Sequence, residues 1–167
     1  MENCTGTAGP RLAQFADIDA NDKVWDVACG TGVVALTAAR CGLSVTTENL
    51  TSALIKRAKE NSKIFNLDVD LHECNGEDLP FEDASFDVIV SQFGHMFAAR
   101  PSVAFGEMFR VLKPNGTIAF STWPPELFMG RFFQINRKYG PPLTKATEPL
   151  ILWGECGNHA HTPVIPR

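Results

Sequence analysis

The chain has 167 residues, enough for one domain with a sizeable core, and 44% of them are hydrophobic against 20% charged. This balance is typical of a folded globular protein and excludes a disordered chain. A net charge of −4 without any Lys or Arg stripe argues against nucleic acid and anionic membranes as partners. No apolar run reaches the roughly 18 residues of a membrane span, and no signal peptide opens the chain. The five cysteines lack paired spacing, so we expect reduced thiols in a cytoplasmic protein.

Strands and helices are expected to alternate as far as residue 122. Strands are predicted at 24–28, 44–47, 69–74, 86–91 and 117–122, and helices after Pro10, at 32–40, at 53–63 and from Pro101 to Leu112, with a turn at 113–116. Leu12 and Phe15 are expected on one face of the first helix, and Phe105, Met108, Phe109 and Leu112 form a core-facing stripe in the last. Such alternation predicts an α/β fold, a Rossmann-like doubly wound, mostly parallel sheet of about five strands with helices on both faces. Ligands of these sheets bind at the carboxyl ends of the strands.

The stretch from Val24 to Gly32 contains the feature around which the rest is organised. A buried strand ends in a glycine turn, and a helix opens directly after it. Glycines let the backbone approach a ligand, and a helix start offers unpaired N–H groups, so this order favours a site for a nucleotide-like ligand. The spacing Gly30-x-Gly32-x-x-Ala35 also fits the dinucleotide fingerprint of dehydrogenases, and an ordinary strand-to-helix turn remains a third interpretation.

Three further motifs follow in series. They are Glu-Asp-Leu-Pro-Phe at 77–81, Ser-Phe-Asp-Val-Ile-Val at 85–90 and Val-Leu-Lys-Pro-Asn-Gly at 111–116, after Asp-x-Ala-Cys-Gly-Thr-Gly at 26–32. In this order the chain resembles the class I S-adenosylmethionine-dependent methyltransferases, most of all the small-molecule branch of ubiquinone/menaquinone-type C-methyltransferases. The resemblance covers roughly residues 22–123. A dehydrogenase interpretation leaves the last three motifs unexplained.

The resemblance implies an S-adenosylmethionine-binding Rossmann-like domain at 1–122. A proline-rich extension at 123–167 follows, with one helix expected from Glu126 to Lys138 and its Phe128, Phe132 and Ile135 on one face. Nothing in the extension resembles the family's last two strands, which implies a C-terminal truncation. The implied function is methyl transfer to an unidentified small-molecule acceptor, with S-adenosylhomocysteine as the product. The alternative is a catalytically inactive or truncated methyltransferase fold that serves as a cofactor-binding or interaction module.

The resemblance also implies which residues contact the cofactor. Asp26 is expected to orient its methionine end, the glycine turn to pack against it, Asn49 to meet the ribose, Leu50 and Asn75 to face the adenine, and Ser91 to Phe93 to border the sulfonium. The full expected set is Asp26, Ala28, Cys29, Gly30, Gly32, Asn49, Leu50, Asn75, Gly76, Glu77, Ser91, Gln92 and Phe93.

Three of these positions depart from the family pattern. Ala28 stands where the family has its first glycine, which the fold absorbs if φ stays negative. Asn49 and Asn75 replace carboxylates, and losing two charged hydrogen bonds weakens cofactor affinity by about one to two orders of magnitude. Glu48 is adjacent, but strand alternation predicts that its side chain points the other way.

Methyl transfer needs a base only if the acceptor must lose a proton. His95 is the candidate near the expected site, and the alternative is a packed histidine on an apolar loop. Cys29 is expected to be a packing residue rather than a nucleophile. Cys156-x-x-His159-x-His161 offers only three ligands, so no metal is expected.

The fifth strand is expected to lie at an open sheet edge. Without covering strands, Ile118 and Phe120 would flank a row of unpaired backbone groups, which templates pairing with another chain. We therefore expect a homodimer in which this edge and the C-terminal extension share the interface.

Overall fold

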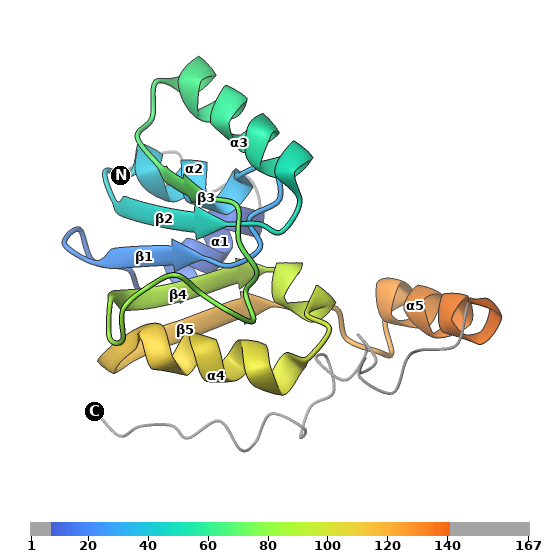
Figure 1. Cartoon of the computed structure of the whole chain (residues 1–167). Helices are drawn as coiled ribbons and strands as arrows, with labels where there is room; N and C mark the ends of the chain where they lie inside the picture. The colour runs from blue at the N-terminus through green and yellow to red at the C-terminus, as the bar shows by residue number, and fades with distance from the viewer. Residues whose placement is uncertain (1–7, 141–167) are drawn as a thin grey trace.

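The structure, a computed structural model, describes residues 8–140 as a parallel sheet with helices on both faces (Figure 1). The strands of this range are β1 (Lys23–Asp26), β2 (Ser44–Glu48), β3 (Asp70–His72), β4 (Phe86–Gln92) and β5 (Leu112–Ser121). The helices are α1 (Ala8–Phe15), α2 (Val33–Arg40), α3 (Ser52–Phe65), the 3-10 helix η1 (Gly94–Phe97), α4 (Pro101–Val111) and α5 (Phe128–Tyr139).

The strand order is β3-β2-β1-β4-β5, and every pair is parallel. The chain runs outward from β1 through β2 to β3 and then returns to place β4 on the other side of β1. The order therefore reverses between β1 and β4, and ligands of doubly wound sheets bind beyond the carboxyl ends of the strands at such a point. The predicted fold class is confirmed.

Alternating side chains of the central strands build two cores. Val24 and Trp25 follow each other in β1 and are both fully buried, but Val24 packs with Leu12 of α1, whereas Trp25 packs with Met108 of α4. Successive strand residues point to opposite faces of a sheet, so a strand covered on both faces is mostly apolar. This is why the central strands were visible in the sequence as continuous apolar runs.

Only one of the two residues expected on one face of α1 is buried. Leu12 and Ala16 are buried, but Phe15 is 78% exposed. Residues 12 and 16 lie four positions apart and share one side of the helix, and contact with the sheet selects that side. Helical spacing alone could not tell it from the side that carries Phe15.

The predicted stripe of α4 is confirmed for Phe105, Met108 and Leu112, which pack in one core cluster, but not for Phe109. The buried residues of the helix are Pro101, Ala104, Met108 and Val111, at spacings of three, four and three. Phe109 is 38% exposed, and Leu112 begins β5 instead of ending the helix. Phe109 matches the helical spacing, but its exposure shows that it lies away from the sheet.

The predicted turn at 113–116 lies within β5. Phe86 pairs with Leu112 and Val88 with Thr117, so four residues of β5 lie opposite one residue of β4 and three of them are extra. A side chain at Gly116 would lie 2.7 Å from the carbonyl oxygen of Asp87, which explains the glycine. The residues predicted to form a turn therefore do so, but as a bulge within one strand.

Within the described residues, β5 pairs only with β4 and forms one edge of the sheet. Ile118 and Phe120, expected to face water, are instead half-buried against the cluster that contains Met108. The prediction of a bare apolar flank was thus wrong for these two side chains, because α4 covers that face of β5.

Helix α5 lies beyond the carboxyl ends of the strands, set apart from the sheet (Figure 1). It begins two residues later than predicted, and Phe128, Phe132 and Ile135 share one exposed face of it as expected. Residues 141–167, with the Cys156, His159 and His161 motif, lie outside the described residues. The division into 1–122 and 123–167 stays a prediction.

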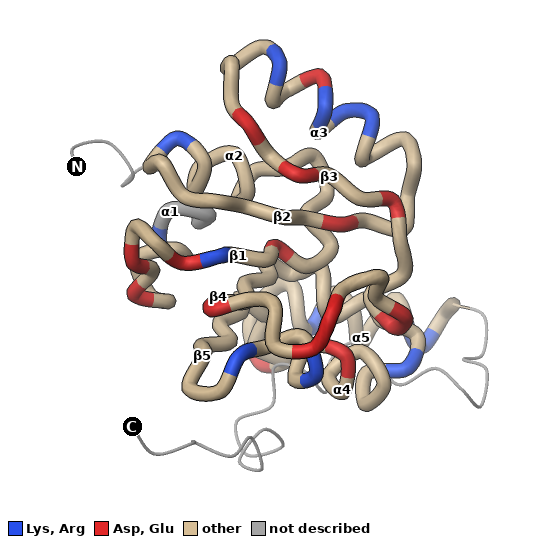
Figure 2. Tube along the Cα trace, turned by 60° about the vertical axis from the view of Figure 1, so that its left-hand side comes forward, with Lys and Arg blue, Asp and Glu red and all other residues tan. Residues whose placement is uncertain are grey.

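Charged residues are scattered over the surface of the described chain (Figure 2). The basic residues of α3 are interrupted by Glu60, which forms an ion pair with Arg57 at 3.0 Å. None of the helices between residues 8 and 140 is long and apolar enough to cross a bilayer.

Candidate cofactor site

The turn between β1 and α2 is built from left-handed backbone. Gly30 has φ +59° and Gly32 has φ +87°, and a side chain on Gly32 would lie 3.3 Å from Ala58 of α3. A Cβ placed on Gly30 meets nothing within 4 Å, so the backbone there faces open space. The turn thus offers uncovered main chain at Gly30, beyond the carboxyl end of β1.

Ala28 does not keep the negative φ on which its tolerance was predicted to depend. Its φ is +54°, a conformation that costs an L-residue roughly 1–2 kcal/mol. The Ala28 N–H donates to Oε1 of Glu48 at 3.0 Å, and this bond helps to hold the strained conformation.

Asp26 ties the end of β1 to the start of α2. The residue is 1% exposed, and its Oδ2 accepts a hydrogen bond from Ala35 N at 3.1 Å. Burial raises the pKa of this carboxyl to about 8, although the bond from Ala35 lowers it, and the negative charge of Glu48 raises it further. Asp26 therefore fixes the first turn of the helix that follows the glycines.

Glu48 is a site residue that the strand pattern placed outside the site. Its carboxylate lies between two expected cofactor positions, because Oε1 accepts the bond from Ala28 and lies 3.4 Å from a Cβ placed on Gly76. Burial raises the pKa of Glu48 to about 7, against the lowering effect of the Ala28 bond. No periodicity signal could have found this contact, since it depends on how three chain segments meet.

The side chain of Asn49 bonds to the backbone at the start of α3. Its Oδ1 accepts a hydrogen bond from Thr51 N at 2.9 Å, so the carbonyl oxygen of its amide is already engaged. The amide NH₂ group, a donor, is what this side chain can offer to a ribose hydroxyl. Leu50 beside it is 69% exposed and so is free to cover a flat ligand.

The segment after β3 turns tightly around Asn75. The Oδ1 of Asn75 accepts from Glu77 N at 3.1 Å, and Asp78 N donates to the Asn75 carbonyl. The Glu77 carboxylate accepts bonds from N and Nε of Arg100 at 2.7 and 2.6 Å. Burial would raise the pKa of Glu77, but these bonds lower it. The carboxylate of Glu77 is thus engaged with the start of α4, so its part in the expected site is to hold the loop.

The segment after β4 packs onto the glycine turn. Ser91 is fully buried, and its Oγ donates to the Val27 carbonyl at 2.9 Å and accepts from His95 N at 3.0 Å. Phe93 stacks flat on Trp123 with ring centres 4.1 Å apart. Ser91 therefore braces the two strand ends from inside, whereas half-buried Gln92 and Phe93 lie at the strand end itself.

His95 is 2% exposed, and its ring stacks on Phe120 with centres 4.5 Å apart. The packing alternative describes what the structure shows, and the catalytic role stays a prediction. Burial, together with the negative charges of Asp26 and Glu48, raises the pKa of the Cys29 thiol to about 12. A thiol protonated at neutral pH is a poor nucleophile, which agrees with the expected packing role.

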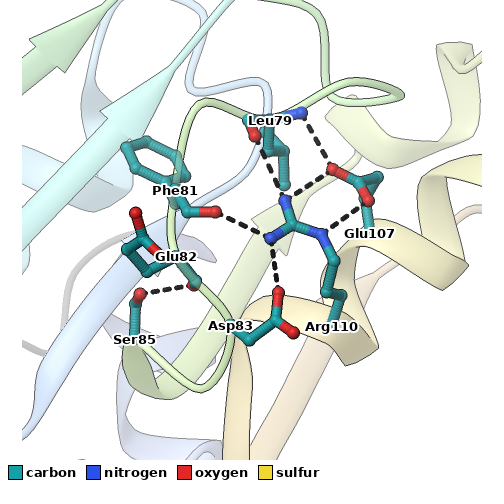
Figure 3. A network of polar contacts seen from close by, with 7 residues as sticks. All are labelled: Leu79, Phe81, Glu82, Asp83, Ser85, Glu107 and Arg110. Carbon is teal, nitrogen blue, oxygen red and sulfur yellow. Dashed lines mark hydrogen bonds and ion pairs between the residues drawn. The ribbon is translucent and has the colours of Figure 1, made fainter.

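A polar network that the sequence did not reveal holds the segment between β3 and β4 against α4 (Figure 3). Arg110 and Glu107 of α4 bond to the backbone of Leu79 and Phe81. Arg110 directly precedes the motif at 111–116, and that position was its only sequence signal. Within residues 8–140, no group of three His, Cys, Asp or Glu side chains could hold a metal ion.

These residues fit a nucleoside cofactor. An uncovered backbone turn, an amide donor at the end of β2 and a tight polar turn after β3 surround the carboxyl ends of neighbouring parallel strands. Such a donor set suits ribose and base rather than a metal ion.

Comparisons with known proteins agree with this geometry. A methyltransferase-domain family matches residues 25–120. An uncharacterized protein of Mycobacterium tuberculosis is 36% identical over 153 residues, which cover 92% of this chain and 56% of that relative. The ubiquinone/menaquinone biosynthesis C-methyltransferase UbiE of Bartonella quintana is 40% identical over 101 residues, 58% of this chain and 39% of the relative. The chain thus spans about half the length, or less, of these curated relatives.

Among solved structures, a SAM-dependent methyltransferase from Methanosarcina mazei superposes with a TM-score of 0.65 at 27% identity. The superposition covers 71% of this chain and 61% of that one. The family match covers more than half of the present sequence and contains the glycine turn and the three later motifs. The chain therefore belongs to the class I S-adenosylmethionine-dependent methyltransferases.

Proposed function

We propose that this chain binds S-adenosylmethionine at the carboxyl ends of β1, β2 and β4 and transfers its methyl group to a small-molecule acceptor. The observation that carries the proposal is the turn from Ala28 to Gly32, in which the left-handed backbone of Gly30 faces open space where the strand order reverses. S-adenosylmethionine supplies a methyl group already activated on a sulfonium, so the protein has mainly to align it and exclude water.

Each residue near the turn has a distinct part in this proposal. The backbone of Gly30 and Gly32 takes the amino-acid end of the cofactor, and Asp26 keeps α2 in place beneath it. The amide of Asn49 donates to the ribose, and Leu50 covers the adenine. Asn75 and Gly76 contact the base from the opposite side, while Gln92 and Phe93 border the transferred methyl group. Glu77 acts through Arg100 by holding its loop.

The acceptor has a candidate place beside β5. A hollow of about 390 Å³ lies between α1 and the end of β5, lined by Arg11, Leu12, Phe15, Phe120 and Ser121. Its apolar residues and single cation suit a small amphipathic molecule. For an acceptor that must lose a proton, we propose His95, which follows β4 beside the position proposed for the transferred methyl group, as the base.

Calorimetric titration tests cofactor binding first. We expect S-adenosylhomocysteine to bind and NAD not to bind, and tighter binding of NAD would refute the proposal. A methyl-release assay over quinols, phenols and amines then tests transfer, and His95→Gln should slow only acceptors that lose a proton. Cofactor binding without transfer to any acceptor would favour the non-catalytic alternative. We further propose a cytoplasmic location, consistent with the free thiols of Cys29 and Cys74.

A further inference from the structure

The segment from Asn75 to Asp83 links β3 to β4 and has almost no β-bridge hydrogen bonds of its own. Between these strands, the structure gives it a single isolated bridge, from Asn75 to Asp78. The backbone N–H and C=O groups of such a segment must find hydrogen-bond partners outside a sheet. In this protein the partners are side chains of α4.

Arg110 of α4 saturates its hydrogen-bonding capacity in this segment (Figure 3). Its Nη1 donates to the Phe81 carbonyl at 2.7 Å and to Oδ1 of Asp83 at 2.9 Å. Its Nη2 donates to the Leu79 carbonyl at 3.1 Å and to Oε2 of Glu107 at 2.8 Å, and its Nε donates to Oε1 of Glu107 at 2.8 Å. A guanidinium has five N–H donors, and each one has an acceptor here.

Glu107 completes the attachment. Its Oε2 accepts the Leu79 N–H at 2.9 Å, so both backbone groups of Leu79 are bonded to α4. Leu79 itself is 6% exposed in the core and so is fixed on both its polar and its apolar side. Bonds from Arg110 lower the pKa of the Glu107 carboxyl despite its burial, which keeps the pair charged at neutral pH.

The same segment reaches the cofactor site at its other end. Arg100, at the start of α4, holds Glu77 through its N and Nε. Gly76, the preceding residue, lies against Glu48, which in turn holds Ala28 of the glycine turn. Displacing residues 79–81 would therefore displace the short turn formed by Asn75 and Gly76, only a few residues upstream.

We propose that Arg110 is a positioning residue for recognition of the adenine base. It contacts no ligand, but together with Glu107 it fixes the position of the turn in which Asn75 and Gly76 meet the base. This inference rests on the proposed function. A lysine at position 110 keeps the charge but has three donors on one nitrogen, so it cannot bond Leu79, Phe81, Asp83 and both oxygens of Glu107 together.

The test compares two ligands that differ only in the base. S-adenosylhomocysteine carries the 6-amino group, and S-inosylhomocysteine carries an oxygen in its place. We expect the wild-type chain to prefer the adenosyl ligand by about tenfold or more, because a polar site discriminates strongly against a mismatched hydrogen-bonding group. Arg110→Lys should weaken adenosyl binding by about tenfold and bring the preference close to one.

Two further variants separate positioning from general destabilisation. Arg57→Lys changes the same residue type in another Arg–Glu pair at i, i+3, exposed on α3, and should leave the preference unchanged. Glu107→Gln is a milder change that removes the charge but keeps the shape, and we expect it to reduce the preference in part. It serves as the test if Arg110→Lys does not fold. Thermal unfolding without ligand monitors the folded state of each variant.

The outcomes are distinct. A preference that persists in folded Arg110→Lys and Glu107→Gln overturns the inference, as does equal wild-type affinity for the two ligands. A wild-type chain that binds neither ligand refutes the proposed function itself. A preference lost in the α4 variants but kept in Arg57→Lys supports the positioning role.

Discussion

Gly94 lies so close to Ala28 that a Cβ placed on it would be 2.5 Å from both the Cβ and the carbonyl oxygen of Ala28. This contact joins the segment after β4 to the turn after β1, across the point where the strand order reverses. Only glycine permits it, because real Cβ atoms do not approach so closely. The contact also explains why Ala28 can hold its positive φ, since η1 covers it.

Gly94→Ala should therefore separate these two segments. We expect a loss of about 1–3 kcal/mol in the free energy of unfolding, as for other overpacked sites, together with weaker cofactor binding. Urea unfolding and titration with S-adenosylhomocysteine measure the two effects. Gly106→Ala is the control, because it lies inside α4 with nothing within 4 Å of its added Cβ. It should stabilise the protein by about 0.5–1 kcal/mol, and equal losses in both variants would contradict the close contact.

Gly30→Ala adds one methyl group to the space proposed for the cofactor. The affinity for S-adenosylhomocysteine should fall by at least about tenfold, since the Cβ enters otherwise open space beside the backbone. Gly42→Ala is a matched control, with a positive φ of +84° and equally open surroundings at the end of α2. Both variants should lose about 1 kcal/mol of stability from backbone strain. If the two bind the cofactor equally well, the cofactor does not lie over Gly30.

Asn49→Asp should tighten cofactor binding about tenfold. An aspartate can keep the bond from Thr51 N with one oxygen and offer the other as an acceptor to the ribose hydroxyls. Asn136→Asp, exposed on α5, controls for the added charge. Unchanged affinity would mean that the ribose does not meet this side chain or that Glu48 already serves it.

Stability should fall as the pH rises from about 4 to 8. Burial raises the folded-state pKa values of Asp26 and Glu48 to about 8 and about 7, so between the unfolded and folded values the native state binds more protons than the unfolded state. The free energy of unfolding then decreases with pH in this window. Glu48→Gln should flatten the slope in chemical unfolding, because Gln keeps an acceptor for Ala28 N but cannot ionise. The same substitution at Glu60, exposed in its ion pair with Arg57, should not flatten it, and an equal effect there would contradict the assignment.

A homodimer through the edge of β5 and the C-terminal extension stays a prediction. The described sheet leaves β5 paired on one side only, and α5 carries exposed Phe128, Phe132 and Tyr139. Light scattering during size exclusion at micromolar concentration should give twice the chain mass. A clean monomer rules the dimer out and would indicate that the chain's own extension covers the edge.

The sequence by itself determined the fold class and the location of the glycine turn. Strands buried on both faces are mostly apolar, and turns with positive φ favour glycine, so both constraints are visible in the sequence between Val24 and Gly32. The turn at 113–116 was visible in the sequence in the same way, from residue types that favour turns. Each of these features depends on residues that are neighbours in the chain.

Tertiary structure alone decided which of several compatible faces is buried and which side chains meet. Phe15 and Phe109 fit a helical stripe as well as Leu12 and Met108 do, and only packing against the sheet left them exposed. Glu48 reaches Ala28 and Gly76 because three segments converge at the strand ends. Arg110 meets Leu79 across 31 positions of the sequence. Such contacts leave no periodic pattern, because the partner's position is set by how the sheet and α4 pack together and not by local spacing.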